Sequence, residues 1–142
     1  MRRATFLVLA VTLAGCGDVT TPSGVDTGSG DPTPTAGSVS FSNDVFPAFE
    51  RRNCVQCHSG NGPGRDDGGL MLDGGVNPVH REVTQETSPN HDVLRVDVDA
   101  PAASLLVVMP LGTGVHGRFF ADTSDPDYAL FVTWISEGAQ KN

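Results

Sequence analysis

Apolar positions are distributed unevenly along the chain and divide it into successive segments. Residues 4–14 form an almost unbroken apolar run. Residues 17–38 consist mostly of Gly, Pro, Ser, Thr and Asp, a composition that cannot form a hydrophobic core and that predicts a flexible linker. From Phe41 onward apolar residues return at helical spacing, so residues 41–142 are predicted to be the folded domain.

A first helix is predicted within residues 41–54. Ser42 or Asn43 is suited to cap its N-terminus, and Pro47 is tolerated because it falls near the first turn. Asp44 suits the positive end of the helix dipole. The apolar residues that share one face are Val45, Phe46 and Phe49. The chain therefore enters the first cysteine of the domain from an amphipathic helix.

A second helix is predicted near the C-terminus. Asp125 is suited to the N-cap, Pro126 to the first helical position and Gly138 to the stop. The apolar stripe of this helix contains Phe131, Trp134 and Ile135, with Leu130 on its flank. Core packing is the simplest interpretation of the stripe.

Composition indicates a small domain that is rich in loops. The chain has 142 residues, of which 17 are Gly and 10 are Pro, and only 6% are aromatic. A folded part of about 100 residues buries a limited core. A bound cofactor would therefore be one way to supply apolar interior.

The chain is acidic. Its net charge is −8, and this becomes −10 if Arg2 and Arg3 are removed with an export signal. An acidic surface argues against nucleic acid as a partner and against docking on anionic lipid by charge. It favours a protein partner with a basic docking face, although solubility alone also accounts for it.

Residues 1–15 have the features of a secretory signal peptide: positive charge, a short apolar stretch and small residues before Cys16. The apolar run is too short to span a bilayer as a helix. Leu13–Cys16 resembles the lipobox of bacterial lipoproteins, which implies a lipid anchor on Cys16 and a location in the bacterial cell envelope, on its periplasmic or outer-surface side. Residues 16–40 are then the lipidated cysteine and its linker. An ordinary signal peptide followed by an unpaired thiol is the alternative.

Cys54, Cys57 and His58 form a C-x-x-C-H motif. A C-x-x-C pair suits a redox dithiol, a disulfide, half of a zinc site or covalent attachment of haem, and the adjacent histidine favours haem c. Two thioether bonds hold the haem, and the histidine is then placed to bind its iron. A thioredoxin-like site would lie in a βαβ pattern, which the sequence lacks. A disulfide with an incidental histidine and a zinc site remain the alternatives.

Residues 41–58 resemble the opening of small bacterial cytochrome c domains of the kind found in planctomycetes and myxobacteria. Three later segments also match: Gly68–Asp73, Pro101–Leu106 and Asp125–Ala139. Over residues 41–139 the chain is thus similar to a class I-like monohaem c-type cytochrome domain. The resemblance implies a mainly α, small cytochrome c-like helical fold wrapped around one covalent haem, with long Gly/Pro-rich loops.

The second iron ligand is predicted to be His116, with Met109 as the alternative. Met109 and the proline after it resemble the pair that supplies a thioether ligand in many class I cytochromes. However, 25 residues separate Met109 from Trp134, against 18 for His116, and the shorter interval fits the layout of the relatives better. His116 also begins a segment that resembles the H-G-G segment of relatives with a histidine ligand, although Arg118 stands where a further glycine is common.

Other residues that bear on chemistry are predicted to be incidental. His80 and His91 lie in polar surroundings and are expected at the surface, and Met71 is expected to pack near the haem edge. Gly60–Gly64 precedes no helix-like pattern and is predicted to be a loop, not a phosphate site. The acidic pairs are expected to be solvated; they are Asp66 with Asp67 and Asp97 with Asp99.

The predicted function is electron transfer by a membrane-tethered monohaem cytochrome that is not itself an enzyme. No paired carboxylates or nucleophile–base pair stands out in the sequence. Its partners would be redox proteins, and a second imidazole ligand would give a lower haem potential than a thioether. The alternatives are a haem domain that senses a small ligand at a labile sixth position and a cytochrome subunit of a larger membrane redox enzyme.

Overall fold

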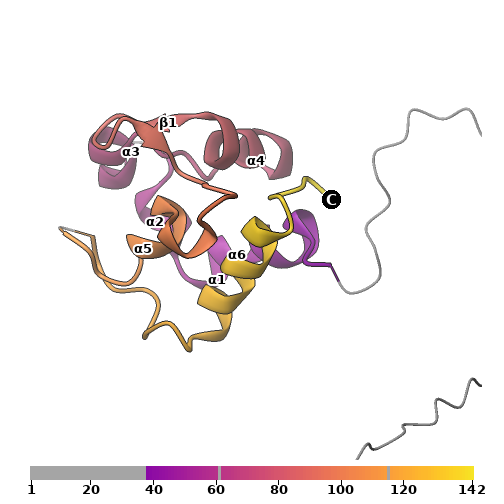
Figure 1. Cartoon of the computed structure of the whole chain (residues 1–142). Coiled ribbons are helices and arrows are strands. Elements are labelled where there is room, and N and C mark those ends of the chain that lie inside the picture. The colour runs from indigo at the N-terminus through magenta and orange to yellow at the C-terminus, as the bar shows by residue number, and fades with distance from the viewer. Residues whose placement is uncertain (1–37, 61, 115) are drawn as a thin grey trace, which may run out of the picture.

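The structure is a computed structural model that describes residues 38–60, 62–114 and 116–142. This part of the chain consists of short helices joined by loops (Figure 1). The helical elements are η1 (Phe41–Val45), α1 (Phe46–Arg51), α2 (Cys54–Cys57), α3 (Pro63–Gly68), α4 (Val76–Gln85), η2 (Pro101–Ala103), α5 (Leu105–Val108) and α6 (Pro126–Ser136). Two short strands, β1 (Thr87–Ser88) and β2 (Val93–Leu94), pair in antiparallel fashion. The predicted mainly α class is confirmed.

The predictions for the N-terminal region fall largely outside this part of the chain. The expected signal peptide (residues 1–15), the lipidated Cys16 and most of the linker (residues 16–40) are not among the described residues. The first helical element begins at Phe41, where the sequence predicts the folded domain to begin. Within the described residues, no helix is long and apolar enough to cross a membrane.

The N-terminal helix is capped two to three residues earlier than predicted. Ser40, and not Ser42 or Asn43, is the N-cap of η1: its hydroxyl accepts from the Asn43 N–H at 3.1 Å. The Asp44 carboxylate in turn accepts from the Ser40 N–H at 2.8 Å, so side chains of the first turn satisfy the N–H groups of both Ser40 and Asn43. The cap lies earlier because the first turn is a wide π-type turn that begins at Phe41.

The C-terminal helix α6 begins and ends as its sequence predicts. The Asp125 carboxylate accepts from the Asp127 N–H at 2.9 Å, and Pro126 occupies the first turn. The helix ends at Ser136, and Gly138 follows with a φ of +93°, a conformation that glycine adopts without a steric penalty.

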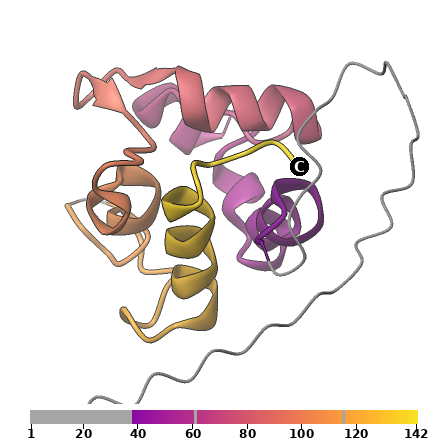
Figure 2. The ribbon, with the colours of Figure 1, turned by 45° about the vertical axis from the view of Figure 1, so that its right-hand side comes forward.

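The core forms where α6 packs against η1 and α1. The rings of Phe41 and Trp134 lie 5.1 Å apart between centroids, and those of Phe49 and Phe131 lie 5.2 Å apart in an edge-to-face arrangement. Trp134 is fully buried, and its indole N–H donates to the Gln140 carbonyl at 2.9 Å. The C-terminal residues then run back to the start of the domain, where Asn142 accepts from the Phe41 N–H at 2.7 Å (Figure 2).

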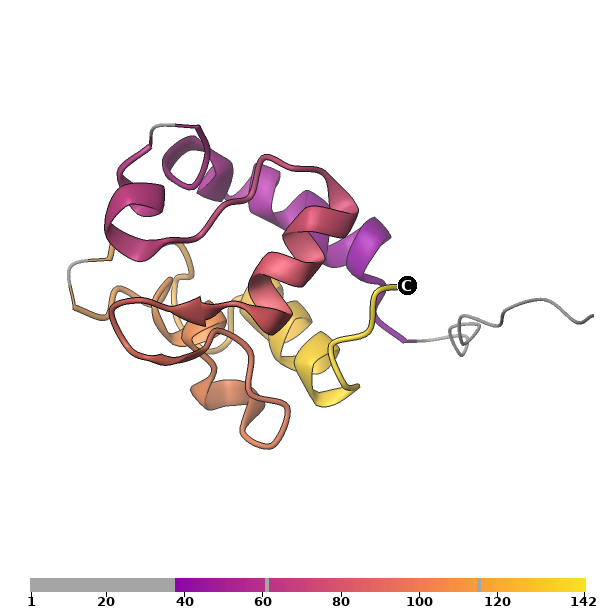
Figure 3. The same ribbon diagram turned by 90° about the horizontal axis from the view of Figure 1, so that it is seen from above.

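Several helical elements were not predicted from the sequence, and two of them, α3 and α4, lie near the C-x-x-C-H motif or the core. The first, α3, begins at Pro63, so the predicted Gly60–Gly64 loop is wrong at its end. The second, α4, buries Val79 and Val83, which lie four residues apart on one face. Seen from above, α4 lies between α3 and the C-terminal residues (Figure 3). Most other residues of α4 are polar, which hides its apolar face from a count of apolar residues.

A buried arginine joins these two helices. The Arg95 side chain donates to the carbonyls of Glu82 and Glu86 at 3.2 and 3.0 Å, and to the Gly68 carbonyl at 3.3 Å. These carbonyls lie at the C-terminal ends of α4 and α3, where backbone oxygens lack helical partners and a cation is favourable. Arg95 is 4% exposed and therefore anchors α3 and α4 from inside the domain.

Candidate functional site

Cys54 and Cys57 lie on the single helical turn α2. Asn53 precedes this turn with a φ of +57°, a left-handed conformation that asparagine tolerates better than most residues, and it separates α2 from α1. Residues three apart in a helix lie on the same side. Both cysteines are half-buried and free, so the structure offers two adjacent thiols and no disulfide between them.

The Cys54 thiol is a weak acid in this environment. Burial raises its pKa from 9.0 to about 11, although the Cys54 backbone and Arg52 act in the opposite direction. The thiol is therefore protonated at neutral pH. A redox dithiol of the C-x-x-C type needs a lowered pKa at its attacking cysteine, so this environment does not favour that chemistry.

His58 directly follows α2 and has its ring fixed by backbone. Its Nδ1 lies 3.3 Å from the Leu70 carbonyl oxygen, which can only accept a hydrogen bond, so Nδ1 carries the proton and Nε2 presents a lone pair. Burial lowers the pKa of His58 more than the bond to Leu70 raises it. The ring is thus a neutral imidazole, the form that binds metals.

Two glycines let the chain after His58 fold closely around it. A Cβ atom at Gly62 would lie 2.2 Å from the Cys57 carbonyl oxygen, and one at Gly64 would lie 2.6 Å from Cε1 and Nδ1 of the His58 ring. No side chain fits at either distance. The backbone of the first turn of α3 therefore packs directly on the His58 imidazole, with no side chain between them.

His116 lies in a loop whose base is tied down by backbone hydrogen bonds. Leu111 and Arg118 form an isolated antiparallel bridge. The Pro110 carbonyl accepts from the N–H groups of Phe119 and Phe120 at 2.8 and 3.0 Å. These contacts hold together the two ends of the loop that carries His116, directly after α5.

The loop brings the His116 ring next to the His58 ring. The two ring centroids are 6.1 Å apart, and the ring planes differ by 19°. The His116 Nδ1 lies 2.8 Å from the Gly117 carbonyl oxygen, so it too carries its proton on Nδ1 and presents a lone pair on Nε2. The edge of the Phe119 ring system supports His116, with centroids 5.5 Å apart.

The distance of 6.1 Å between the two ring centroids matches the value expected if both imidazoles were to bind one metal ion. A metal–nitrogen bond of about 2 Å, and about 1.1 Å from each nitrogen to its ring centroid, put the two centroids about 6 Å apart. His58 and His116 are 58 residues apart in the sequence. Their juxtaposition therefore depends on the tertiary fold.

The other predicted ligand, Met109, follows the last residue of α5 and is half-buried. Its carbonyl accepts from the N–H groups of Gly112 and Thr113 at 3.0 and 3.3 Å, so its backbone forms the start of the loop that carries His116. Met71 is 37% exposed, more than its apolar neighbours suggest. His91 is exposed, as predicted.

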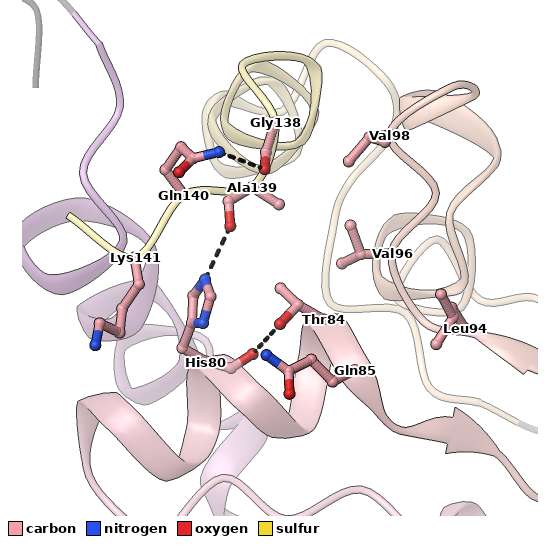
Figure 4. Close-up of a pocket in the computed structure, with 10 residues that line it drawn as sticks. All are labelled: His80, Thr84, Gln85, Leu94, Val96, Val98, Gly138, Ala139, Gln140 and Lys141. Atoms are coloured by element: carbon pink, nitrogen blue, oxygen red, sulfur yellow. Dashed lines mark hydrogen bonds between the residues drawn. The ribbon is translucent and has the colours of Figure 1, made fainter. Parts of the chain in front are cut away.

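His80, predicted to lie at the surface, is half-buried. Its ring packs edge-on against Phe41 and Trp134, with centroids 4.9 and 6.1 Å away, and its Nε2 donates to the Ala139 carbonyl at 2.8 Å. It lines a groove of about 450 Å³ between α4, the segment after β2 and the residues after α6 (Figure 4). Because α4 was not predicted, the sequence gave no reason to place His80 against the core.

The donor set at the cysteine pair suits haem attachment. Two free thiols on one helical turn, the adjacent His58 and the facing His116 are all present. In the part of the chain that the structure describes, no three side chains from His, Cys, Asp and Glu form a group that would hold a metal ion by themselves. A haem iron needs fewer ligands from the protein, because the porphyrin nitrogens supply the others.

Comparisons of the chain with protein-family models, with curated proteins and with solved structures found no match.

Proposed function

We propose that this chain is a monohaem c-type cytochrome that transfers electrons. The observation that carries the proposal is the pairing of a C-x-x-C-H motif with a second histidine, His116, whose ring centroid lies 6.1 Å from that of His58. When bound, the haem iron supplies one-electron exchange between its ferric and ferrous states. A small cytochrome c-like fold around one covalent haem is part of this proposal.

The residues divide the work of holding such a group. Cys54 and Cys57 would form the two thioether bonds, and His58 would bind the iron through Nε2. The Leu70 carbonyl and the close approach of Gly64 fix the orientation of the His58 ring, which a metal-binding histidine requires. The raised pKa of the Cys54 thiol keeps it un-ionised at neutral pH, which slows reactions of its thiolate such as oxidation.

His116 is proposed as the second iron ligand, with Met109 as the alternative. The support for His116 is its hydrogen bond to Gly117 through Nδ1, which leaves the lone pair on Nε2, and its near-parallel ring beside His58. Two imidazole ligands give a lower potential than an imidazole with a thioether. We therefore expect a low-potential carrier.

The setting of this carrier is proposed from the sequence. A lipid anchor on Cys16 would tether the domain in the bacterial cell envelope, and the acidic surface would suit redox partner proteins with a basic docking face. The protein then acts as an electron carrier and not as an enzyme.

The test is to mature the protein with haem-attachment machinery and record its ferric and ferrous spectra. Covalent haem with a low-spin ferric spectrum is expected, without the weak long-wavelength band of sulfur ligation. If the unsubstituted protein shows that band and Met109→Ala loses it, Met109 is the ligand and the assignment of His116 is contradicted. Absence of covalent haem in the unsubstituted protein, with Cys54→Ala/Cys57→Ala as the matched blank, would refute the proposed function.

The two alternative functions make different predictions for the same sample. A sensor with a labile sixth ligand binds carbon monoxide in the ferrous state as readily as a five-coordinate haem. A subunit of a larger enzyme co-purifies with stoichiometric partners. A monodisperse monomer that binds carbon monoxide only slowly is the result expected for an electron carrier.

A further inference from the structure

Arg52 is a partly buried arginine at the junction between the first helix and the haem-binding motif. It is the C-cap residue of α1 and stands two residues before Cys54, and its side chain is 25% exposed. Its guanidinium donates to the carboxylates of Asp125 and Asp127, at the start of α6. The guanidinium group is planar, and its Nε and Nη2 each donate to one of these carboxylates. A lysine ammonium group does not reproduce this geometry.

The same guanidinium also reaches the chain that leaves the His116 loop. Its Nη1 donates to the Phe119 carbonyl at 3.0 Å, and its central carbon lies 5.7 Å from the centroid of the Phe120 ring. Phe119 in turn contacts His116 ring to ring and bonds to Pro110 at the base of the loop. Arg52 is thus connected through Phe119 to His116, and it stands six residues before His58 in the chain.

Asp125 completes the connection on the loop side. One of its carboxylate oxygens accepts from Arg52, and the other accepts from the Ala121 N–H at 3.0 Å. Residues 119–121 are therefore held from both sides by the same ion cluster, through Arg52 and through Asp125. Asp125 and Asp127 are both buried, so water cannot readily take the place of Arg52, and loss of the arginine would leave buried carboxylates without a partner.

We infer that Arg52 is a positioning residue that holds the loop carrying His116 against the segment carrying Cys54, Cys57 and His58. This inference rests on the proposed function, since it assigns Arg52 a role toward the second iron ligand. Arg52 touches neither histidine ring; it acts through the Phe119 carbonyl. Without it, His116 leaves its position more readily and an external ligand competes with it more successfully.

Arg51 provides a matched control. It also bonds to Asp127, at 2.6 Å, but its side chain is 51% exposed. Among the described contacts of this cluster, Arg51 donates only to Asp127. The hydrogen bond to the Phe119 carbonyl comes from Arg52. Arg51→Gln and Arg52→Gln therefore each remove one positive charge beside Asp127, and only Arg52→Gln also removes the bonds to Asp125 and to the Phe119 carbonyl that hold residues 119–121.

The test is cyanide binding to the ferric, haem-loaded full chain, because cyanide must displace the second protein ligand. A hydrogen bond from a charged donor is strong enough to change such an equilibrium about tenfold. We expect Arg52→Gln to bind cyanide about tenfold more tightly than the unsubstituted protein, and Arg51→Gln to stay within about twofold. Equal affinities for the two variants would overturn the inference.

A double variant separates positioning from a general structural effect. In a His116→Ala background the displaced ligand is absent, so Arg52→Gln is expected to leave cyanide affinity unchanged. The inference fails if Arg52→Gln tightens binding equally with and without His116. It also fails if His116→Ala alone does not change cyanide binding, a result that would point to Met109 while the proposed function stands.

Arg52→Lys guards against loss of folding in Arg52→Gln. Lysine keeps the positive charge beside Asp125 and Asp127 but not the planar fork, and we expect it to tighten cyanide binding at least about threefold. A folded Arg52→Lys protein with unchanged affinity would overturn the inference. If the unsubstituted protein holds no covalent haem, the proposed function fails, a result that is distinct from unchanged affinity in a haem-loaded variant.

Discussion

The close approach of α3 to His58 predicts opposite effects for the same substitution at two glycines of one helix. At Gly64 an added Cβ would lie 2.6 Å from two atoms of the His58 ring, whereas at Gly68 it would lie 3.9 Å from Cε1 of the same ring. Both glycines belong to α3 and neither has a positive φ. Alanine therefore gains helix propensity at both sites, and only Gly64→Ala also creates a clash.

The magnitudes follow from these distances. The Gly64→Ala methyl needs about 0.9 Å more space to reach a normal carbon contact of about 3.5 Å. The His58 ring cannot move freely because its Nδ1 is bonded to the Leu70 carbonyl. Overpacking of this kind costs about 1–3 kcal/mol, while replacing a helical glycine by alanine gains about 0.5–1 kcal/mol. We expect Gly64→Ala to be less stable than Gly68→Ala by about 1–3 kcal/mol.

The assay is urea unfolding of the haem-free chain at pH 7, followed by circular dichroism, with both variants and the unsubstituted protein compared at equal m-values. Haem-free protein is used so that the result does not depend on the proposed cofactor. Stabilities of Gly64→Ala and Gly68→Ala within about 0.5 kcal/mol of each other would refute the reasoning, since α3 would then not lie on the His58 ring.

Three further predictions concern the cysteine pair, the ion cluster and the core. With a pKa of about 11, against 9.0 for an ordinary cysteine, the Cys54 thiol in a haem-free Cys57→Ser protein should react with iodoacetamide at pH 8 about 100-fold more slowly than the same segment as a peptide; equal rates would contradict its burial. Burial would raise the pKa of Asp127, but hydrogen bonds from Arg51 and Arg52 outweigh it and lower the pKa below 3.8, so its stabilisation is present above this value and is lost as pH falls through the folded-state pKa. The stability gap between Asp127→Asn and the unsubstituted protein in urea unfolding should therefore be largest near pH 7 and close below pH 3.8, and a gap independent of pH would contradict the pairing. Trp134→Ala should cost about 3–5 kcal/mol in the same assay, because the fully buried indole packs on Phe41; a loss as small as that of a surface substitution would mean that the ring is not in the core.

Local signals in the sequence were sufficient for the ends of α6. Asp125 as N-cap, Pro126 in the first turn and Gly138 after the last turn each act within a few residues of the helix end, so their effect is readable from neighbouring positions. The buried stripe of α6 was likewise predicted, because helical periodicity is a local property.

The helices α3 and α4 were missed for a different reason. Neither has a side chain that caps its N-terminus, and α4 buries only Val79 and Val83 among polar residues. Their ends are satisfied by Arg95, which lies in a later segment and donates to both. A helix whose terminal carbonyls are bonded by a distant residue carries little trace of this in its own sequence.

For the candidate site, the sequence by itself determined the chemical groups and their immediate order. Cys54, Cys57 and His58 lie within five consecutive residues, so one helical turn is enough to set the spacing of the thiols beside the histidine. The pairing of His58 with His116, the packing of Gly64 on the imidazole and the reach of Arg52 to the Phe119 carbonyl were decided only by the tertiary structure. The physical reason is that each depends on the relative placement of segments far apart in the chain, which is set by the packing of α6 against η1 and α1 and by the closure of long loops, and not by the conformational preferences of the residues themselves.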